Sequence, residues 1–296
     1  MEAKWEGVVT REMEIHNCLD LSERIQALYS RTPDYYAIIE ECNKRAGFKS
    51  CERIYFGSSF CGQYFLSIKA QVVDELIKVC QKEGYKLGLV IPTFTQKNLE
   101  RGKKHIASYE KYMGDIIDEI VVNDYGMLDY IYKMYNGKIK LNMGRLFMKD
   151  YREIRYPEYF NQVYKPKIFT PYLDKLIEKY NIKGMLFDAT HKTVDFSEKP
   201  EEIEIGIYEP YTYMTVGQIC ELGSTHLPIE KKFRPNFGCK QECNEHVIQY
   251  FVNEGVNWLR IGRTIYFENR DFTIQGLSKL KRIYCPYDLE VKKCEC

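Results

Sequence analysis

Residues 86–92 read KLGLVIP, and this run indicates the fold class. It is apolar at consecutive positions, which is typical of a strand covered on both faces in a parallel sheet. The preceding segment, 71–83, carries apolar residues at helical spacing and is followed by Gly84, which suits a helix C-cap. A further strand-like run, RIYF, stands at 53–56. Strand, helix and strand in this order predict a right-handed βαβ unit.

The same alternation continues toward the C-terminus. We expect helices over 98–112, 127–135, 172–180, 244–254 and 274–280. About eight strands favour a closed barrel over an open sheet, so the sequence predicts a single α/β domain with a TIM-barrel-like (β/α) barrel. The expected strands are 53–56, 86–92, 117–122, 138–143, 184–187, 203–208, 213–219 and 256–261.

Three segments are expected along the chain. Residues 1–50, with a helix over 34–45, read as a short N-terminal helical appendage. The barrel domain follows over 51–284, and 285–296 reads as a cysteine-containing tail that includes Cys285, Cys294 and Cys296. That trio could bind adventitious metal or serve in redox exchange, or it could consist of unpaired surface thiols.

Composition narrows the classes of function. The chain has 43 basic and 42 acidic residues, a balance that argues against broad, salt-driven binding to nucleic acid. Neither a span of about 20 apolar residues nor a secretory signal is visible, so a cytoplasmic protein is expected. In a reducing compartment the 11 cysteines are poor candidates for disulfides. They are better explained as buried thiols, a catalytic thiol or metal ligands.

Four cysteines form the candidate ligand set. Cys239 and Cys243 make a C-x3-C pair in FGCKQECNEH, Cys220 follows the expected strand at 213–219, and Cys61 follows the strand at 53–56. Residues beyond the carboxyl ends of barrel strands converge on one face. The strands at 53–56 and 213–219 are the first and seventh of the eight expected, and in a closed ring of eight these two lie close together. We therefore expect the four thiols to meet.

Four thiolates suit either structural Zn²⁺ or a [4Fe–4S] cluster. Zinc sites commonly contain two paired knuckles, whereas only one pair is present here. Spacing alone therefore favours a cluster, with zinc and inert thiols as the alternatives.

Three stretches resemble the U-32 peptidase family. They are RIYFGSSFC at 53–61, VVNDYGMLDYI at 121–131 and LNMGRLFMKD at 141–150. The resemblance covers about 53–262, and the four cysteines fall where the family places its own. One departure is Ile219, because the family commonly has arginine before its second cysteine.

The resemblance implies a function as well as a fold. It is strongest to the short, single-domain type, whose members are [4Fe–4S] proteins implicated in oxygen-independent hydroxylation of an aromatic ring, with a homologous partner subunit. Relatives modify RNA bases. It therefore implies an iron–sulfur oxidoreductase that acts on a small molecule or an RNA base. A U-32-type peptidase, and a structural or accessory metal-cluster protein that works with a catalytic partner, are the alternatives.

Polar residues after three other expected strands are candidate catalytic groups. They are Asp124, Arg145 and Asp188, and Arg145 could bind a carboxylate with its guanidinium fork. Asn123 and His191 are similar cases. The competing interpretation is that these side chains cap loops by hydrogen bonding.

Overall fold

The computed structural model of the protein describes residues 13–148, 168–189, 193–232, 234–235, 239–253, 256–269 and 272–289. Its centre is a closed barrel of parallel strands in the order β1-β14-β8-β6-β5-β4-β3-β2. The predicted TIM-barrel-like α/β domain is confirmed. The barrel strands are β1 (Glu14–Asp20), β2 (Arg53–Gly57), β3 (Lys86–Ile91), β4 (Ile117–Val122), β5 (Lys140–Met143), β6 (Ile182–Asp188), β8 (Glu204–Glu209) and β14 (Lys279–Tyr284).

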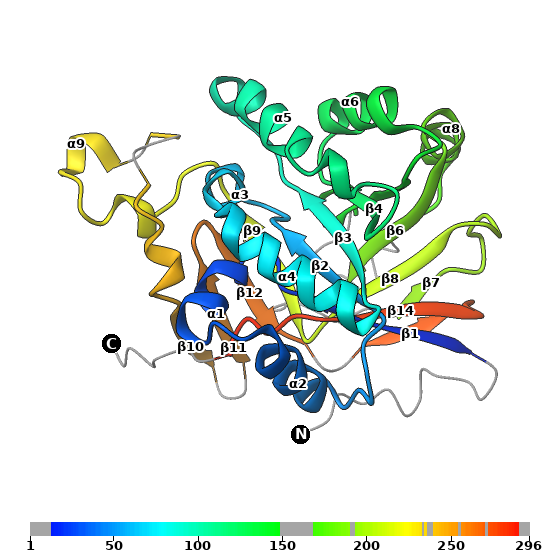
Figure 1. Cartoon of the computed structure of the whole chain (residues 1–296), viewed down its shortest axis with the longest axis horizontal. Helices are drawn as coiled ribbons and strands as arrows, with labels where there is room; N and C mark the ends of the chain where they lie inside the picture. Colours follow the sequence, from blue (N-terminus) through cyan, green and yellow to red (C-terminus); the bar gives the residue numbers. More distant parts are fainter. Residues whose placement is uncertain are drawn as a thin grey trace.

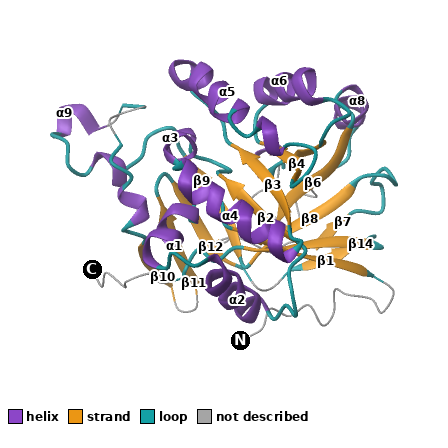
Figure 2. Cartoon of the chain, viewed as in Figure 1, coloured by secondary structure: helices purple, strands orange, loops and turns teal. Residues whose placement is uncertain are grey.

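Helices lie outside the strands, as Figure 2 shows. The longest, α4, ends at Gly84 in a left-handed conformation with φ of +79°, as the sequence predicts. No helix in the described part of the chain is long and apolar enough to cross a bilayer. The α-helices are α1 (Ile25–Arg31), α2 (Tyr35–Ala46), α3 (Gly62–Ser67), α4 (Ala70–Glu83), α5 (Leu99–Ala107), α6 (Tyr125–Tyr135), α8 (Pro171–Lys179) and α9 (Ile229–Lys232).

Short 3-10 helices occupy several connections. They are η1 (Gln96–Asn98), η2 (Glu110–Tyr112), η3 (Arg145–Phe147), η4 (Leu222–Ser224) and η5 (Glu242–Asn244).

A second, antiparallel sheet is inserted between β8 and β14. Its strands are β9 (Tyr211–Val216), β10 (Ile248–Asn253), β11 (Val256–Ile261) and β12 (Thr264–Glu268), in the order β10-β11-β12-β9. Figure 1 shows this sheet to the left of the barrel, near the labels of α1 and α3. A smaller parallel pair joins β7 (Thr193–Asp195) to β13 (Thr273–Gln275).

Two predicted strands and two predicted helices differ in the structure. The expected strands at 213–219 and 256–261 exist as β9 and β11, but they belong to the antiparallel sheet and not to the barrel. The helices expected at 244–254 and 274–280 are wrong, because β10 lies in the first range and β13 and the start of β14 occupy the second. A short apolar run cannot reveal its partner strand, because pairing is decided by tertiary contacts.

The barrel closes through β1, which the sequence predicts to be part of an appendage, and through β14, whose start it predicts to be helical. Residues 14–20 are no appendage, because β1 pairs in parallel with both β14 and β2. The polar first half of this strand, EIHN, is partly exposed, which hides it from a search for apolar runs. Cys285 does not belong to a free tail either, because it is fully buried just after β14. Cys294 and Cys296 lie outside the described residues.

Candidate metal centre

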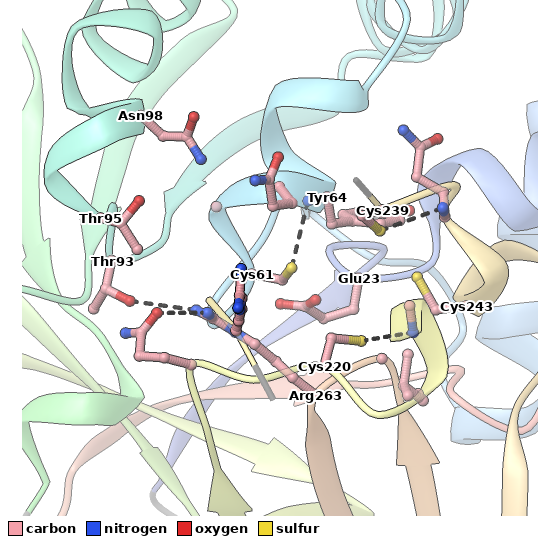
Figure 3. A pocket seen from close by; sticks show the side chains of 18 residues that line it. Glu23, Cys61, Tyr64, Thr93, Thr95, Asn98, Cys220, Cys239, Cys243 and Arg263 are labelled. Atoms are coloured by element: carbon pink, nitrogen blue, oxygen red, sulfur yellow. Dashed lines mark hydrogen bonds between the residues drawn. The ribbon is translucent and has the colours of Figure 1, made fainter. Parts of the chain in front are cut away.

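Cys61, Cys220, Cys239 and Cys243 line one cavity, as the sequence predicts. Figure 3 shows their side chains around it. The cavity has a volume of about 50 Å³, several times the roughly 10–15 Å³ that one water needs. Other lining residues follow the carboxyl ends of β1, β2 and β3, so the site lies on the face where barrel enzymes build their active sites. Among them are Glu23, Gly62, Gln63, Tyr64, Thr93 and Thr95.

The route by which the cysteines converge differs from the one expected. Cys220 follows β9, which is not a barrel strand, so adjacency around the ring does not bring it to Cys61. The inserted sheet brings it there instead, because β9 leaves the carboxyl end of β8. Gln241 has a left-handed backbone with φ of +63° and turns the chain between Cys239 and Cys243.

Glycines keep the space between the sulfurs open. A Cβ atom on Gly223 would lie 3.4 Å from Sγ of Cys220 and 3.5 Å from Sγ of Cys239. A Cβ atom on Gly262 would lie 3.8 Å from Sγ of Cys243. Within the described ranges, no three His, Cys, Asp or Glu side chains are close enough together to hold a single ion. The four thiols line the wall of the cavity.

Backbone amides donate to three of the four sulfurs. The N–H of Tyr64 lies 3.4 Å from Sγ of Cys61, at the start of α3. Sγ of Cys220 accepts from Gly223 at 3.2 Å, and Sγ of Cys239 accepts from Gln241 at 3.3 Å. Such N–H donors stabilise negative charge on sulfur and tune the potential of metal thiolates.

Burial has the opposite effect on the thiols. It raises the pKa of all four, to about 11 for Cys239. The other three cysteines raise the pKa of Cys243 further, because negative charges on neighbouring sulfurs would repel one another. Thiols bind a metal as thiolates, so a metal that binds these cysteines releases their protons.

Glu23 is a functional candidate that the sequence reading missed. Its side chain is buried in the cavity wall (Figure 3), and one carboxylate oxygen accepts from the hydroxyl of Ser58 at 2.7 Å and from the amides of Ser59 and Phe60. Burial raises the pKa of Glu23. Its φ of +63° is rare for a residue other than glycine and marks local strain. The available signal was the polar stretch DLSER, directly after a strand that was not recognised.

Two arginines flank the cysteines. Nη1 of Arg24 donates to the carbonyl oxygen of Cys243 at 2.7 Å. Arg263 lines the cavity, where Nη1 donates to Gln218 at 2.8 Å and Nη2 donates to the carbonyl oxygen of Phe60. Arg263 lowers the pKa of Cys61 in part, against the larger effect of burial. Arg24 likewise lowers the pKa of Cys243, again against the larger effect of burial.

Arg145 and Asp188 lie together, away from the residues that line this cavity. Both are fully buried and paired with each other, and Nη1 of Arg145 also donates to the hydroxyl of Tyr287 at 2.9 Å. Asp124 is the N-cap of α6, where its carboxylate accepts from the amide of Met127 at 2.7 Å. All three side chains have structural partners, and their catalytic roles stay predictions.

The remaining polar candidates have equally local partners. Asn123 donates to the carbonyl oxygen of Ile91 at 3.2 Å and accepts from the amide of Leu146. His191 lies outside the described residues.

The chain matches no known family model, no curated protein and no solved structure. The likeness to the U-32 peptidase family therefore stays a prediction.

Proposed function

We propose that this protein holds a [4Fe–4S] cluster through Cys61, Cys220, Cys239 and Cys243. The observation that carries the proposal is that four cysteines from three distant segments line one cavity at the carboxyl end of the barrel. Among thiolate-bound metals, zinc requires four sulfurs about 2.3 Å from one point. A cluster offers a separate iron to each thiolate and so suits sulfurs distributed around a cavity wall.

The surrounding residues fit such a group. Gly223 leaves space between Cys220 and Cys239 that a larger side chain would fill, and backbone N–H groups point at three of the sulfurs. When bound, the cluster supplies one-electron redox chemistry. Arg263 holds the loop before Cys61 through the carbonyl oxygen of Phe60, and Glu23 holds the same loop from the barrel side.

Glu23 is the proton carrier in this proposal. Its carboxyl group lies in the cavity wall, where burial raises its pKa and the hydrogen bonds from Ser58 and Phe60 lower it in part. Oxidative addition of a hydroxyl group releases protons and its loss as water consumes one, so a carboxyl group at the site can accept or supply the proton.

We propose that the reaction is an oxygen-independent hydroxylation, or a related redox modification, of an aromatic ring or an RNA base. The support for this part is the resemblance of 53–61, 121–131 and 141–150 to the U-32 family. A homologous partner subunit belongs to the same proposal.

Anaerobic purification with iron, sulfide and zinc analysis tests the cluster. We expect iron and acid-labile sulfide in the wild type, with the broad visible absorption of a [4Fe–4S] cluster. Serine at each of the four cysteine positions should remove most of this absorption, because one iron loses its thiolate ligand. Cys80→Ser and Cys285→Ser are matched controls, since both cysteines are buried away from the cavity lining.

Other results would point to the alternatives. Stoichiometric zinc without sulfide would identify a structural zinc site. Peptidase activity in a metal-free preparation would overturn the redox proposal and favour a U-32-type peptidase. Spectra that are unchanged in all four serine variants would remove the cluster assignment itself.

A further inference from the structure

Arg24 carries a buried positive charge with no counter-charge in the described part of the chain. The residue is the N-cap of α1, and its side chain is 0% exposed. Nη1 donates to the carbonyl oxygen of Cys243, whereas Nε and Nη2 are buried without a hydrogen-bond partner. The guanidinium group remains charged in proteins, so the charge itself cannot be avoided by losing a proton.

The neighbouring residues do not compensate this charge. Glu23, next in the chain, directs its carboxylate to Ser58, Ser59 and Phe60. The hydroxyl of Tyr64, which interacts electrostatically with Arg24, stays neutral because burial raises its pKa. An unpaired buried charge costs several kcal/mol, so its presence indicates an anionic partner that is not part of the polypeptide.

A loaded cysteine site is such a partner. Four thiolates outweigh the positive charge of an iron–sulfur core, which makes the centre anionic as a whole. Arg24 lies against Cys243, one of the four ligands, and among the described residues no carboxylate accepts a hydrogen bond from its guanidinium group.

We propose that Arg24 is the counter-charge of the metal centre, a positioning residue that stabilises the loaded site and raises its reduction potential. This inference rests on the proposed function. Reduction adds one electron to the centre and makes it more negative, and a nearby positive charge favours that state.

The melting temperature of an Arg24→Met variant tests the proposal, because the difference from wild type should have opposite signs in metal-free and in iron-loaded protein. Methionine fills a similar volume without charge. In metal-free protein the variant should melt at a higher temperature than wild type, because an uncompensated charge has been removed. In iron-loaded protein it should melt at a lower temperature than wild type and lose iron faster to a chelator. A variant that is less stable in both forms, or that fails to fold without metal, overturns the proposal.

The reduction potential supplies an independent test. Under titration with dithionite as the electron donor, Arg24→Gln should change the ratio of reduced to oxidised centre at least tenfold in favour of the oxidised form. For one electron this corresponds to a shift of about 59 mV to more negative potential. Arg24→Lys should remain closer to wild type because it keeps the charge.

Arg31→Gln is the matched control. Arg31 lies on the same helix but is partly exposed, and it donates to the carbonyl oxygen of Glu245. Water screens it, so its variant should keep the wild-type potential. Equal potentials for Arg24→Gln and Arg31→Gln in iron-loaded protein overturn the role of Arg24 alone. A wild type without iron and sulfide overturns the proposed function together with this inference.

Discussion

Nε of Arg145 donates to Oδ1 of Asp188 at 2.9 Å inside the barrel, where neither side chain is exposed to solvent. The guanidinium also lies over the ring of Tyr208, at 4.2 Å from its centroid, and donates to the carbonyl oxygen of Tyr211. This ion pair therefore links β6 and η3 to the start of the inserted sheet. Arg145 and Asp188 therefore stabilise the junction between the barrel and the inserted sheet, and this junction supports the cysteine site.

Asp188→Ala should destabilise the protein by about 3–5 kcal/mol, because Arg145 is left charged, buried and unpaired. Urea unfolding of the metal-free protein measures this loss. Replacing both residues, as Arg145→Met with Asp188→Leu, should cost less than the sum of the single changes. Wild-type stability in Asp188→Ala, together with lost turnover, would instead support the catalytic role predicted from sequence.

Asp124→Ala should cost about 0.5–2 kcal/mol, because the first turn of α6 loses its cap. We expect the iron content to be unchanged, since Asp124 is not among the residues that line the cysteine cavity. Asp129→Ala is the control on the same helix. Its carboxylate pairs with Lys133 at the surface, so the cost should stay within about 0.5 kcal/mol. Loss of iron in Asp124→Ala would reopen a direct role at the site.

The carboxylate of Glu119 should make stability fall in acid. Burial alone would raise the pKa of Glu119, but Lys281, at 2.9 Å, and Arg53 lower it to about 2. The folded pKa is below the ordinary value of 4.5, so this contribution is complete above pH 4.5 and is lost as the pH falls toward 2. The difference between the ordinary and the folded pKa of Glu119 corresponds to about 3 kcal/mol of folding stability.

Urea unfolding of wild type and Glu119→Gln at several pH values from neutral to acid measures this contribution. The variant should be less stable at neutral pH, and the difference from wild type should shrink on acidification. Glu41→Gln removes a partly exposed pair with Arg45 and should show a much smaller change. A difference that is constant with pH would mean that the Glu119 carboxylate does not titrate in this range.

Gly223→Val should remove most of the bound iron while all four cysteines remain. The added atoms would enter the space beside Sγ of Cys220 and Cys239. Iron analysis measures the loss, and circular dichroism shows whether the fold is kept. Gly217→Val is the control, because the nearest atoms to a Cβ there are backbone atoms of Ile219, at 3.6 Å, and not cysteine sulfurs. Full iron loading in Gly223→Val would place the metal elsewhere.

The sequence alone determined the fold class and the cysteine group. The run KLGLVI in β3 is nearly continuous in apolar residues because a strand inside a helical layer is covered on both faces. The cysteines could be grouped because few residue types bind soft metals and because two of them follow expected strands. Local patterns were enough for both conclusions.

Tertiary structure decided how the barrel closes and what surrounds the thiols. The pairing of β1 with β14 joins segments that are more than 250 residues apart, and no local pattern contains that information. Glu23 and Arg24 belong to the site only because β1 is a barrel strand, which places the residues after it on the face where Cys61 and Cys243 meet. Their roles depend on burial and on distances between distant segments, and these exist only in the folded chain.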